Sequence, residues 1–251
     1  MDYKKINSFI HEHIQDFHDN RLKCLSDTKL SGLLEKKNPY LFRAKNLITS
    51  QDLVISLLDA RLSSSEEKIF GDFLEELARY VAKERMKAEK STAHGLDFEY
   101  TKKGTRFLVS VKSGLNWGNS SQWKALEHDF KIARQVFSQR RDKMHIETIL
   151  GVCYGRAKTT TRKSIIKQVV GQNFWYMISG DETFYVKIIE PLGHKAKELT
   201  QGFNENKVLL INKFTKEFTE KYCNKEGRIL WVKIVELNSG NITKDDRVEF
   251  R

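Results

Sequence analysis

An aspartate and a lysine on the two arms of one predicted hairpin are the side chains of this sequence best suited to do chemistry. We predict the arms at Leu96–Tyr100 and Arg106–Lys112. Strand side chains alternate between two faces, so Asp97 shares a face with Ser110 and Lys112, and with Leu108, while the other apolar side chains of both arms share the opposite face. An antiparallel pairing that aligns the apolar residues places Asp97 opposite Ser110, one diagonal step from Lys112.

The apolar face also fixes the register of this hairpin. A slip of one residue would bury the charged side chains and expose the aromatic ones. Gly104, in the turn, can adopt the positive φ that a tight hairpin requires. We therefore expect three facing pairs: Tyr100 with Phe107, Phe98 with Val109 and Leu96 with Val111.

A carboxylate beside a lysine suits metal-dependent phosphodiester chemistry. That reaction needs a metal ion to polarise the phosphate and activate water, and positive charge where the transition state gains negative charge. Mg²⁺ prefers carboxylate, carbonyl and water oxygens. We expect Asp97 as the first ligand, the backbone carbonyl of Val111 as another, and Lys112 as the group that orients water or stabilises the transition state. A surface ion pair worth about 0.2–1 kcal/mol is the alternative explanation.

A further carboxylate is needed, and three glutamates are candidates. Glu67 is the first choice, because steps of three and seven residues connect it to the apolar stripe of a helix predicted to open at Ser63–Ser65. The segment Ser64-Ser65-Glu66-Glu67 also fits a capping box, in which Glu67 would only accept a backbone hydrogen bond at the helix start. Glu75, which could instead be a solvated helix residue, and Glu99 remain alternatives.

Several blocks of the sequence carry a resemblance to a known family. Gly95–Asp97 with Val109–Gln122 resembles type II restriction endonucleases of the PD-(D/E)XK nuclease superfamily, in particular the PmeII-like group. The similarity extends to further blocks: Lys37–Asn46, Ser64–Glu67 with Phe70-Gly71, Gly151–Arg156 and Glu190–Glu198. The resemblance implies a mixed β-sheet flanked by helices and Mg²⁺-dependent cleavage of double-stranded DNA at a short sequence. It also implies a homodimer, and a cognate DNA methyltransferase that protects host DNA.

The resemblance assigns roles position by position. Asp97 matches the aspartate of the superfamily motif and Lys112 its lysine. Ser110 stands where the superfamily pattern usually has a second acid. This departure is the reason to expect Glu67, or else Glu75 or Glu99, to complete the set of catalytic and metal-binding residues.

Two further segments are candidates for contact with DNA. Asn116, Asn119 and Gln122 follow Lys112 and could offer amides to phosphates, although the segment could equally cap the next helix through Ser120 or Ser121. The second candidate is a basic loop with these members: Arg156, Lys158, Arg162 and Lys163. With the net charge of the chain, we expect this loop to bind phosphates.

Composition narrows the class of protein. A chain of 251 residues with a formal net charge of +11 and a pI near 9.4 favours a polyanionic partner. Its three widely spaced cysteines argue against a disulfide framework and a zinc site. No apolar run reaches the ~20 residues of a membrane span, and the N-terminus lacks a signal-peptide core. We therefore expect a soluble, cytoplasmic protein.

The order of predicted elements indicates a mixed α/β fold with helical N- and C-terminal elaborations. After the hairpin we expect a helix over Gln122–Arg141, a buried strand over Ile146–Tyr154 and a strand over Phe184–Ile189. Residues 1–251 are expected to form a single domain, with a catalytic core at about 63–190. The mainly helical segments 1–62 and 191–251 would serve DNA binding or dimerisation. A non-catalytic DNA-binding protein and a structure-specific repair nuclease are the competing hypotheses.

Overall fold

The computed structural model describes residues 1–139, 144–162 and 165–243. The chain divides into two compact units, which are described separately. Unit 1 contains Met1–Phe17 and Ile69–Ala196, and unit 2 contains His18–Lys68 and the chain from Lys197 onward. The expectation of a single domain therefore stays a prediction.

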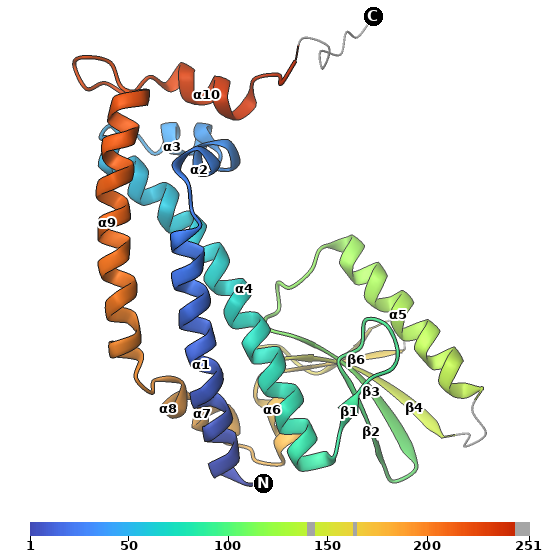
Figure 1. The fold of residues 1–251 in the computed structure, drawn as a ribbon. Helices are drawn as coiled ribbons and strands as arrows, with labels where there is room; N and C mark the ends of the chain where they lie inside the picture. The colour runs from blue at the N-terminus through green and yellow to red at the C-terminus, as the bar shows by residue number, and fades with distance from the viewer. Residues whose placement is uncertain (140–143, 163–164, 244–251) are drawn as a thin grey trace, which may run out of the picture. The chain divides into compact units, whose positions relative to one another are not determined.

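Unit 1 is built on one mixed sheet (Figure 1). Its strands have the order β1-β2-β3-β4-β6-β5, in which β3, β4 and β6 are parallel neighbours and the other pairs are antiparallel. The sheet confirms the mixed α/β class. The strand bounds are β1 Glu89–Lys90, β2 Phe98–Lys102, β3 Thr105–Lys112, β4 His145–Val152, β5 Thr160–Arg162 and β6 Ile166–Val170.

The β2–β3 hairpin has the predicted register. Phe98 pairs with Val109, and Tyr100 pairs with Phe107. The turn contains Lys103 and Gly104, whose φ angles are 51° and 75°, as a two-residue turn with two positive φ values requires.

The expected place of Leu96 in this hairpin is wrong. The strand begins at Phe98, and Leu96 packs with Leu108 on the other face of the sheet from Phe98 and Tyr100. Because Leu96 precedes the regular strand, the alternation of faces does not extend to it.

Both faces of the sheet are covered by helices, with α4 on one side and α5 on the other (Figure 1). Val109 and Val111 of β3 face the α4 side, while Leu108 faces α5. Ser110 is therefore fully buried, although we expected the ionic face of the hairpin to lie outside the apolar layers. A parallel neighbour on β3 explains the difference, because parallel strands bury both faces.

The helices of unit 1 correct two predictions. Phe184–Ile189, predicted as a strand, is helical instead, because a short apolar run fits either structure; Phe184 and Ile188 are the buried side chains of this segment. Ser63–Ser65 opens no helix, since α4 is continuous from Ser50, and the proposed capping box is therefore absent. The bounds are α1 Tyr3–Ser26, α4 Ser50–Met86, α5 Ser120–Ser138, α6 Gln172–Ser179, α7 Phe184–Lys187 and α8 Ile189–Leu192.

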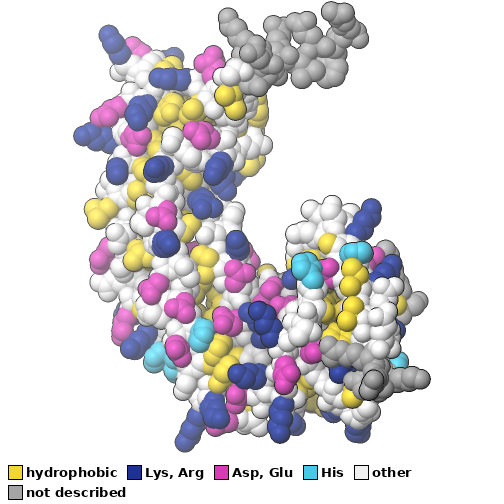
Figure 2. All heavy atoms as spheres, turned by 45° about the vertical axis from the view of Figure 1, so that its right-hand side comes forward, with side chains coloured by type: hydrophobic (Ala, Val, Ile, Leu, Met, Phe, Trp, Pro, Cys, Tyr) yellow, Lys and Arg dark blue, Asp and Glu magenta, His cyan; other side chains and the backbone are white. Residues whose placement is uncertain are grey.

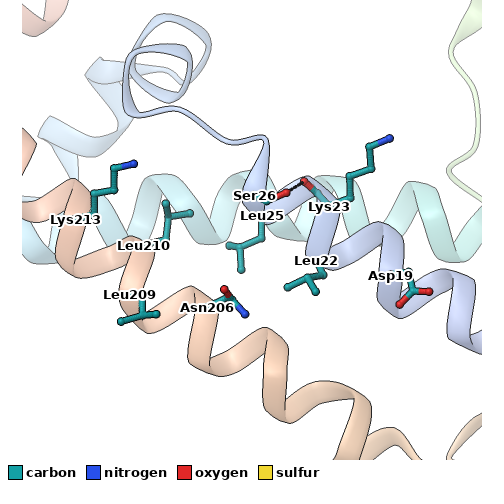
Figure 3. A pocket seen from close by; sticks show the side chains of 9 residues that line it. All are labelled: Asp19, Leu22, Lys23, Leu25, Ser26, Asn206, Leu209, Leu210 and Lys213. Carbon is teal, nitrogen blue, oxygen red and sulfur yellow. Dashed lines mark hydrogen bonds between the residues drawn. The ribbon is translucent and has the colours of Figure 1, made fainter.

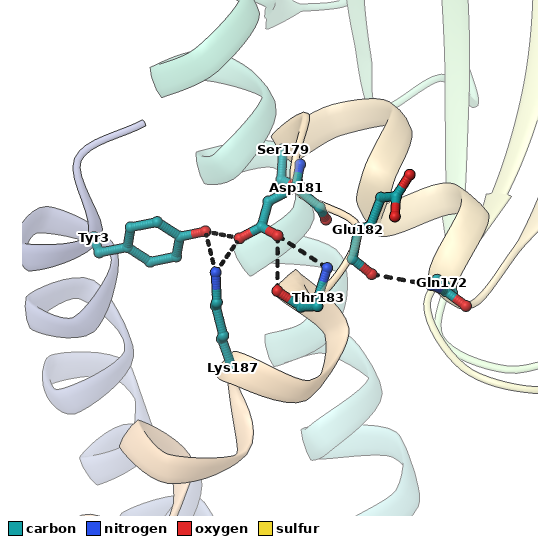
Figure 4. A network of polar contacts seen from close by, with 7 residues as sticks. All are labelled: Tyr3, Gln172, Ser179, Asp181, Glu182, Thr183 and Lys187. Carbon is teal, nitrogen blue, oxygen red and sulfur yellow. Dashed lines mark hydrogen bonds and ion pairs between the residues drawn. The ribbon is translucent and has the colours of Figure 1, made fainter.

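A polar network joins the start of α1 to the segment between α6 and α7 (Figure 4). The Tyr3 hydroxyl donates to Asp181, and Lys187 Nζ lies 2.6 Å from Asp181 Oδ2. The N–H of Thr183 donates to the other carboxylate oxygen at 2.9 Å. Lys187, Tyr3 and Thr183 together hold the pKa of Asp181 well below its ordinary value. The network attaches the first turn of α1 to the sheet-bearing core.

Unit 2 is helical, as the sequence predicted for these segments. It comprises parts of α1 and α4 together with α2 Leu30–Lys36, α3 Pro39–Ala44, α9 Ala196–Tyr222 and α10 Trp231–Ser239. Pro39 starts α3 and separates it from α2, since proline is favoured at the first position of a helix. Leucines of α2 and α4 pack against Phe214 and Phe218 of α9 in a core separate from that of unit 1. Among the described residues, no helix is long and apolar enough to cross a bilayer.

Candidate active site

Asp97 lies at the edge of the sheet, immediately before β2. Its Oδ2 accepts a hydrogen bond from the backbone N–H of Val111 at 2.7 Å and faces the hydroxyl of Ser110 at 3.4 Å. The backbone N–H of Asp97 donates to Val109 at 2.9 Å. These bonds hold the carboxylate against β3 and confirm the predicted proximity of Asp97 and Ser110. Ser110 thus contacts Oδ2 of Asp97, the carboxylate oxygen that is held against β3 and is called the inner oxygen below.

Lys112 ends β3 next to this carboxylate. Its Nζ lies 5.7 Å from the centre of the Trp117 ring, within the range of a cation–π contact. Trp117 in turn packs on Trp123 with ring centres 4.7 Å apart. The indole N–H of Trp117 is buried without a hydrogen-bond partner among the described residues. The lysine is half-buried and held at the end of its strand.

Glu75 is the glutamate that lies at this point. It projects from α4, is half-buried, and accepts a hydrogen bond from the backbone N–H of Ser113. Burial raises the pKa of Glu75, with the negative charge of Asp97 adding to the rise and Lys112 opposing it. The helix comes close to the strand end at Gly71, where an added Cβ would lie 3.0 Å from the Ser113 hydroxyl. Glu75, Asp97 and Lys112 thus interact at one end of β3.

The other two candidate glutamates have different surroundings. Glu67 is exposed and belongs to the part of α4 in unit 2. Glu99 pairs with Leu108 across β2 and β3, and its carboxylate accepts a hydrogen bond from Ser91 at 3.4 Å. Glu75 is thus the glutamate that meets Asp97 and Lys112. The sequence named Glu75 as an alternative only, because its position on the helix also fitted a solvated residue.

Arg79 is a residue at this place that the sequence analysis missed. It follows Glu75 by one helical turn, and its Nη1 lies 3.7 Å from Asp97 Oδ1. The side chain of Arg79 is 41% exposed and that of Asp97 17% exposed. A pattern search could have found it as the basic residue four positions after the glutamate on the same helix face.

The oxygens gathered here fit a hard divalent cation. Asp97 and Glu75 supply two carboxylates. The carbonyl of Val111 lies on the same strand edge as the N–H that binds Asp97, since a strand residue directs both groups to one side. Burial raises the pKa of Glu75 and the negative charge of Asp97 adds to the rise; a bound cation would stabilise both ionised carboxylates. Among the described residues, no group of three or more His, Cys, Asp or Glu side chains could by itself hold a metal ion, so Mg²⁺ bound here would keep several waters, as it usually does.

The polar residues after Lys112 are used locally. Asn119 is the N-cap of α5, and its side chain accepts from the N–H groups of Ser121 and Gln122 at 3.0 and 3.1 Å. The Gln122 side chain accepts from the N–H of Asn119 at 2.9 Å, which completes a capping box. The cap residue is therefore Asn119, not Ser120 or Ser121. Asn116 is exposed on the preceding loop.

The predicted basic loop is only partly described. Arg156 and Lys158 are exposed in the loop between β4 and β5, whereas Lys163 lies outside the described residues. Arg162 donates to Gln168 at 2.9 Å and stacks over Trp123, with 4.2 Å between guanidinium carbon and ring centre. In Figure 2, basic and acidic side chains are interspersed over the face that is shown. Charge alone therefore does not mark a DNA surface on that face.

Comparison with known proteins identifies the family. The family model of the type II restriction endonuclease EcoO109I matches residues 4–200. This range includes Glu75, Asp97 and Lys112 and covers more than half of the chain. None of the curated proteins compared with the chain matches it. Members of this family are DNA phosphodiester hydrolases that act at specific sites. The chain therefore belongs to the EcoO109I family of type II restriction endonucleases.

Proposed function

We propose that this endonuclease cleaves both strands of DNA at a short sequence by Mg²⁺-dependent hydrolysis, with Asp97, Glu75 and Lys112 at its centre. The observation that carries the proposal is the interaction of two carboxylates and one ammonium group at the end of β3. This set replaces the one expected from sequence, in which Glu67 supplied the second carboxylate. The PmeII-like subgroup is part of the proposal and rests on the sequence blocks alone.

Each residue has a distinct part in this proposal. Asp97 offers its outer oxygen Oδ1 to the metal, since Oδ2 already accepts from Val111. Glu75 and the Val111 carbonyl supply the remaining protein oxygens. Lys112 places positive charge beside the scissile phosphate, where the transition state gains negative charge. When bound, the metal would polarise the phosphate and lower the pKa of an attacking water.

Ser110 has a supporting role in the proposal. It is fully buried, and its hydroxyl is directed at the inner oxygen of Asp97. A buried serine cannot supply the negative charge of the acid that usually occupies this position. Glu75, which projects from α4, supplies the missing negative charge instead. The active site therefore keeps two carboxylates despite its departure from the superfamily pattern.

DNA recognition in the proposal depends on the loop between β4 and β5. Arg156 and Lys158 are exposed there, at the carboxyl end of the strand that neighbours β3. Both follow the same edge of the sheet as Lys112, because β3 and β4 are parallel. These two side chains would contact phosphates. Asn119 and Gln122, by contrast, would support the site by capping α5.

The proposal includes a homodimer and a cognate methyltransferase that protects host DNA. Two-fold symmetric proteins match palindromic DNA sites. Unit 2 offers a groove of mixed polar and apolar lining for such contact: α1 and α9 enclose about 590 Å³ with Leu22, Leu25 and Leu209 among its walls (Figure 3). Leu209 is 67% exposed. Sedimentation of the purified enzyme should give twice the chain mass of 29.3 kDa, and a monomer at all concentrations would contradict the dimer.

A digest of unmethylated plasmid tests the proposed reaction. The wild-type enzyme should give discrete fragments in Mg²⁺ and none in EDTA, whereas Asp97→Asn and Lys112→Met should leave the plasmid intact. Lys102→Met removes the same charge from the exposed end of β2 and serves as the control, with cleavage retained. Intact plasmid with retained DNA binding by the wild type would favour a non-catalytic protein. Cleavage restricted to branched or damaged DNA would favour a structure-specific nuclease.

A further inference from the structure

The two oxygens of the Asp97 carboxylate have different partners. Oδ2 is held by the N–H of Val111 at 2.7 Å and faces the Ser110 hydroxyl at 3.4 Å. Oδ1 faces Arg79 Nη1 at 3.7 Å. The inner oxygen is thus fixed by the strand, and the outer oxygen is paired with a charged group from another element.

Arg79 can leave this position easily. Its side chain is 41% exposed, and a separation of 3.7 Å is too long for a strong charge-assisted hydrogen bond. The guanidinium is the more exposed partner of this ion pair, so the pair is easily broken. The backbone of Arg79 is part of the continuous helix α4, so only the side chain needs to move.

We propose that Arg79 is the resident counter-ion of Asp97 Oδ1, which a divalent cation must displace, and that Arg79 thereby weakens metal binding in the DNA-free enzyme. This inference rests on the proposed function, which assigns Oδ1 to the metal. The positive guanidinium and a cation compete for one oxygen and also repel each other. Glu75, one turn earlier on α4, remains beside Asp97 in either state.

Charge balance supports an exchange. Asp97 and Glu75 bring two carboxylates into a partly buried place, and the lysine at the end of β3 is one of the cations near them. Arg79 supplies further positive charge without contributing an oxygen. Once a divalent cation binds beside Asp97 and Glu75, the site would hold an excess of positive charge. Movement of the Arg79 guanidinium toward solvent or a DNA phosphate would then lower the electrostatic energy.

Calorimetric titration of the DNA-free enzyme with Ca²⁺ tests the exchange without any cleavage. Arg79→Gln should bind Ca²⁺ roughly three- to ten-fold more tightly than wild type, because one competing charge is gone. Arg79→Lys, which keeps the charge on a shorter reach, should fall between them. Lys83→Gln removes the same charge one turn further along α4 from an exposed position and should bind Ca²⁺ like wild type. Urea unfolding of each variant checks that it is folded.

Two results would overturn the inference in different ways. In the first, Arg79→Gln binds Ca²⁺ no more tightly than wild type while Asp97→Asn loses binding. This result would reject the role of Arg79 and leave the proposed metal site unchanged. Asp97→Asn that binds Ca²⁺ as wild type does would remove the metal from Asp97 and reject the proposed function as well.

Discussion

At the scale of single residues, Glu75 and Glu67 differ in surroundings and not in chemical type. Glu75 is half-buried beside Asp97 and Lys112, while Glu67 is exposed. The sequence favoured Glu67 because steps of three and seven residues connect it to the apolar residues Phe70 and Leu74. That spacing holds in α4, but only tertiary packing decides which glutamate meets the hairpin.

The raised pKa of Glu75 makes a prediction about stability. Burial is the main cause of the rise from the ordinary value of 4.5. A carboxyl with a raised folded-state pKa favours folding below its unfolded pKa and loses that contribution as pH rises through the folded value. In EDTA, Glu75→Gln should therefore resist urea better than wild type at neutral pH, and the difference should vanish below pH 4.5.

Urea midpoints measured at several pH values in EDTA provide the check. The free energies of unfolding of the two proteins should converge as the pH falls. A Glu75→Gln variant that is less stable than wild type at neutral pH would show that the ionised carboxylate is stabilising in the folded protein. The favourable contacts with Ser113 and Lys112 would then outweigh burial.

At the scale of elements, the hairpin could be predicted and α7 could not. The β2–β3 register follows from local information, since alternation of apolar residues and a glycine turn fix it together. Phe184–Lys187 carries no such pairing signal, and a short apolar run is compatible with a strand or a helix. Its helical state depends on packing against Trp175 and Tyr3, which no local pattern discloses.

The capping box of α5 makes a prediction that separates two roles for Asn119. Asn119→Ala should lower the free energy of unfolding by about 1 kcal/mol, because two helix N–H groups lose their acceptor. Asn119→Ser restores an acceptor oxygen and should recover most of the loss. Urea unfolding measures both variants. If the amide of Asn119 instead binds DNA, Asn119→Ser would keep stability and lose DNA affinity, contrary to the capping role proposed here.

At the scale of the whole molecule, the net charge of +11 favours a polyanionic partner. Composition predicted this partner class, and the family confirms DNA as the substrate. Composition could not predict where on the surface the charges lie. Basic and acidic side chains are interspersed over the face shown in Figure 2. The phosphate contacts must therefore be located residue by residue.

The salt dependence of DNA binding locates one such contact. Each phosphate contact contributes a slope of about 0.9 in a plot of log affinity against log salt. Arg156→Ala should weaken binding and reduce the slope by roughly one, whereas Arg156→Lys should retain it. Both Arg156 variants also carry Asp97→Asn, so that they bind the duplex without cleaving it. An unchanged slope in Arg156→Ala would mean that this exposed side chain contacts no phosphate.

The most direct test of the account compares Glu75→Gln with Glu67→Gln in single-turnover cleavage of a plasmid at saturating Mg²⁺. The two substitutions remove the same charge from the same helix, so they differ only in place. We predict that Glu75→Gln slows cleavage roughly a hundredfold or more, while Glu67→Gln stays within about threefold of wild type. Cleavage lost in Glu67→Gln and retained in Glu75→Gln would contradict the active site described here.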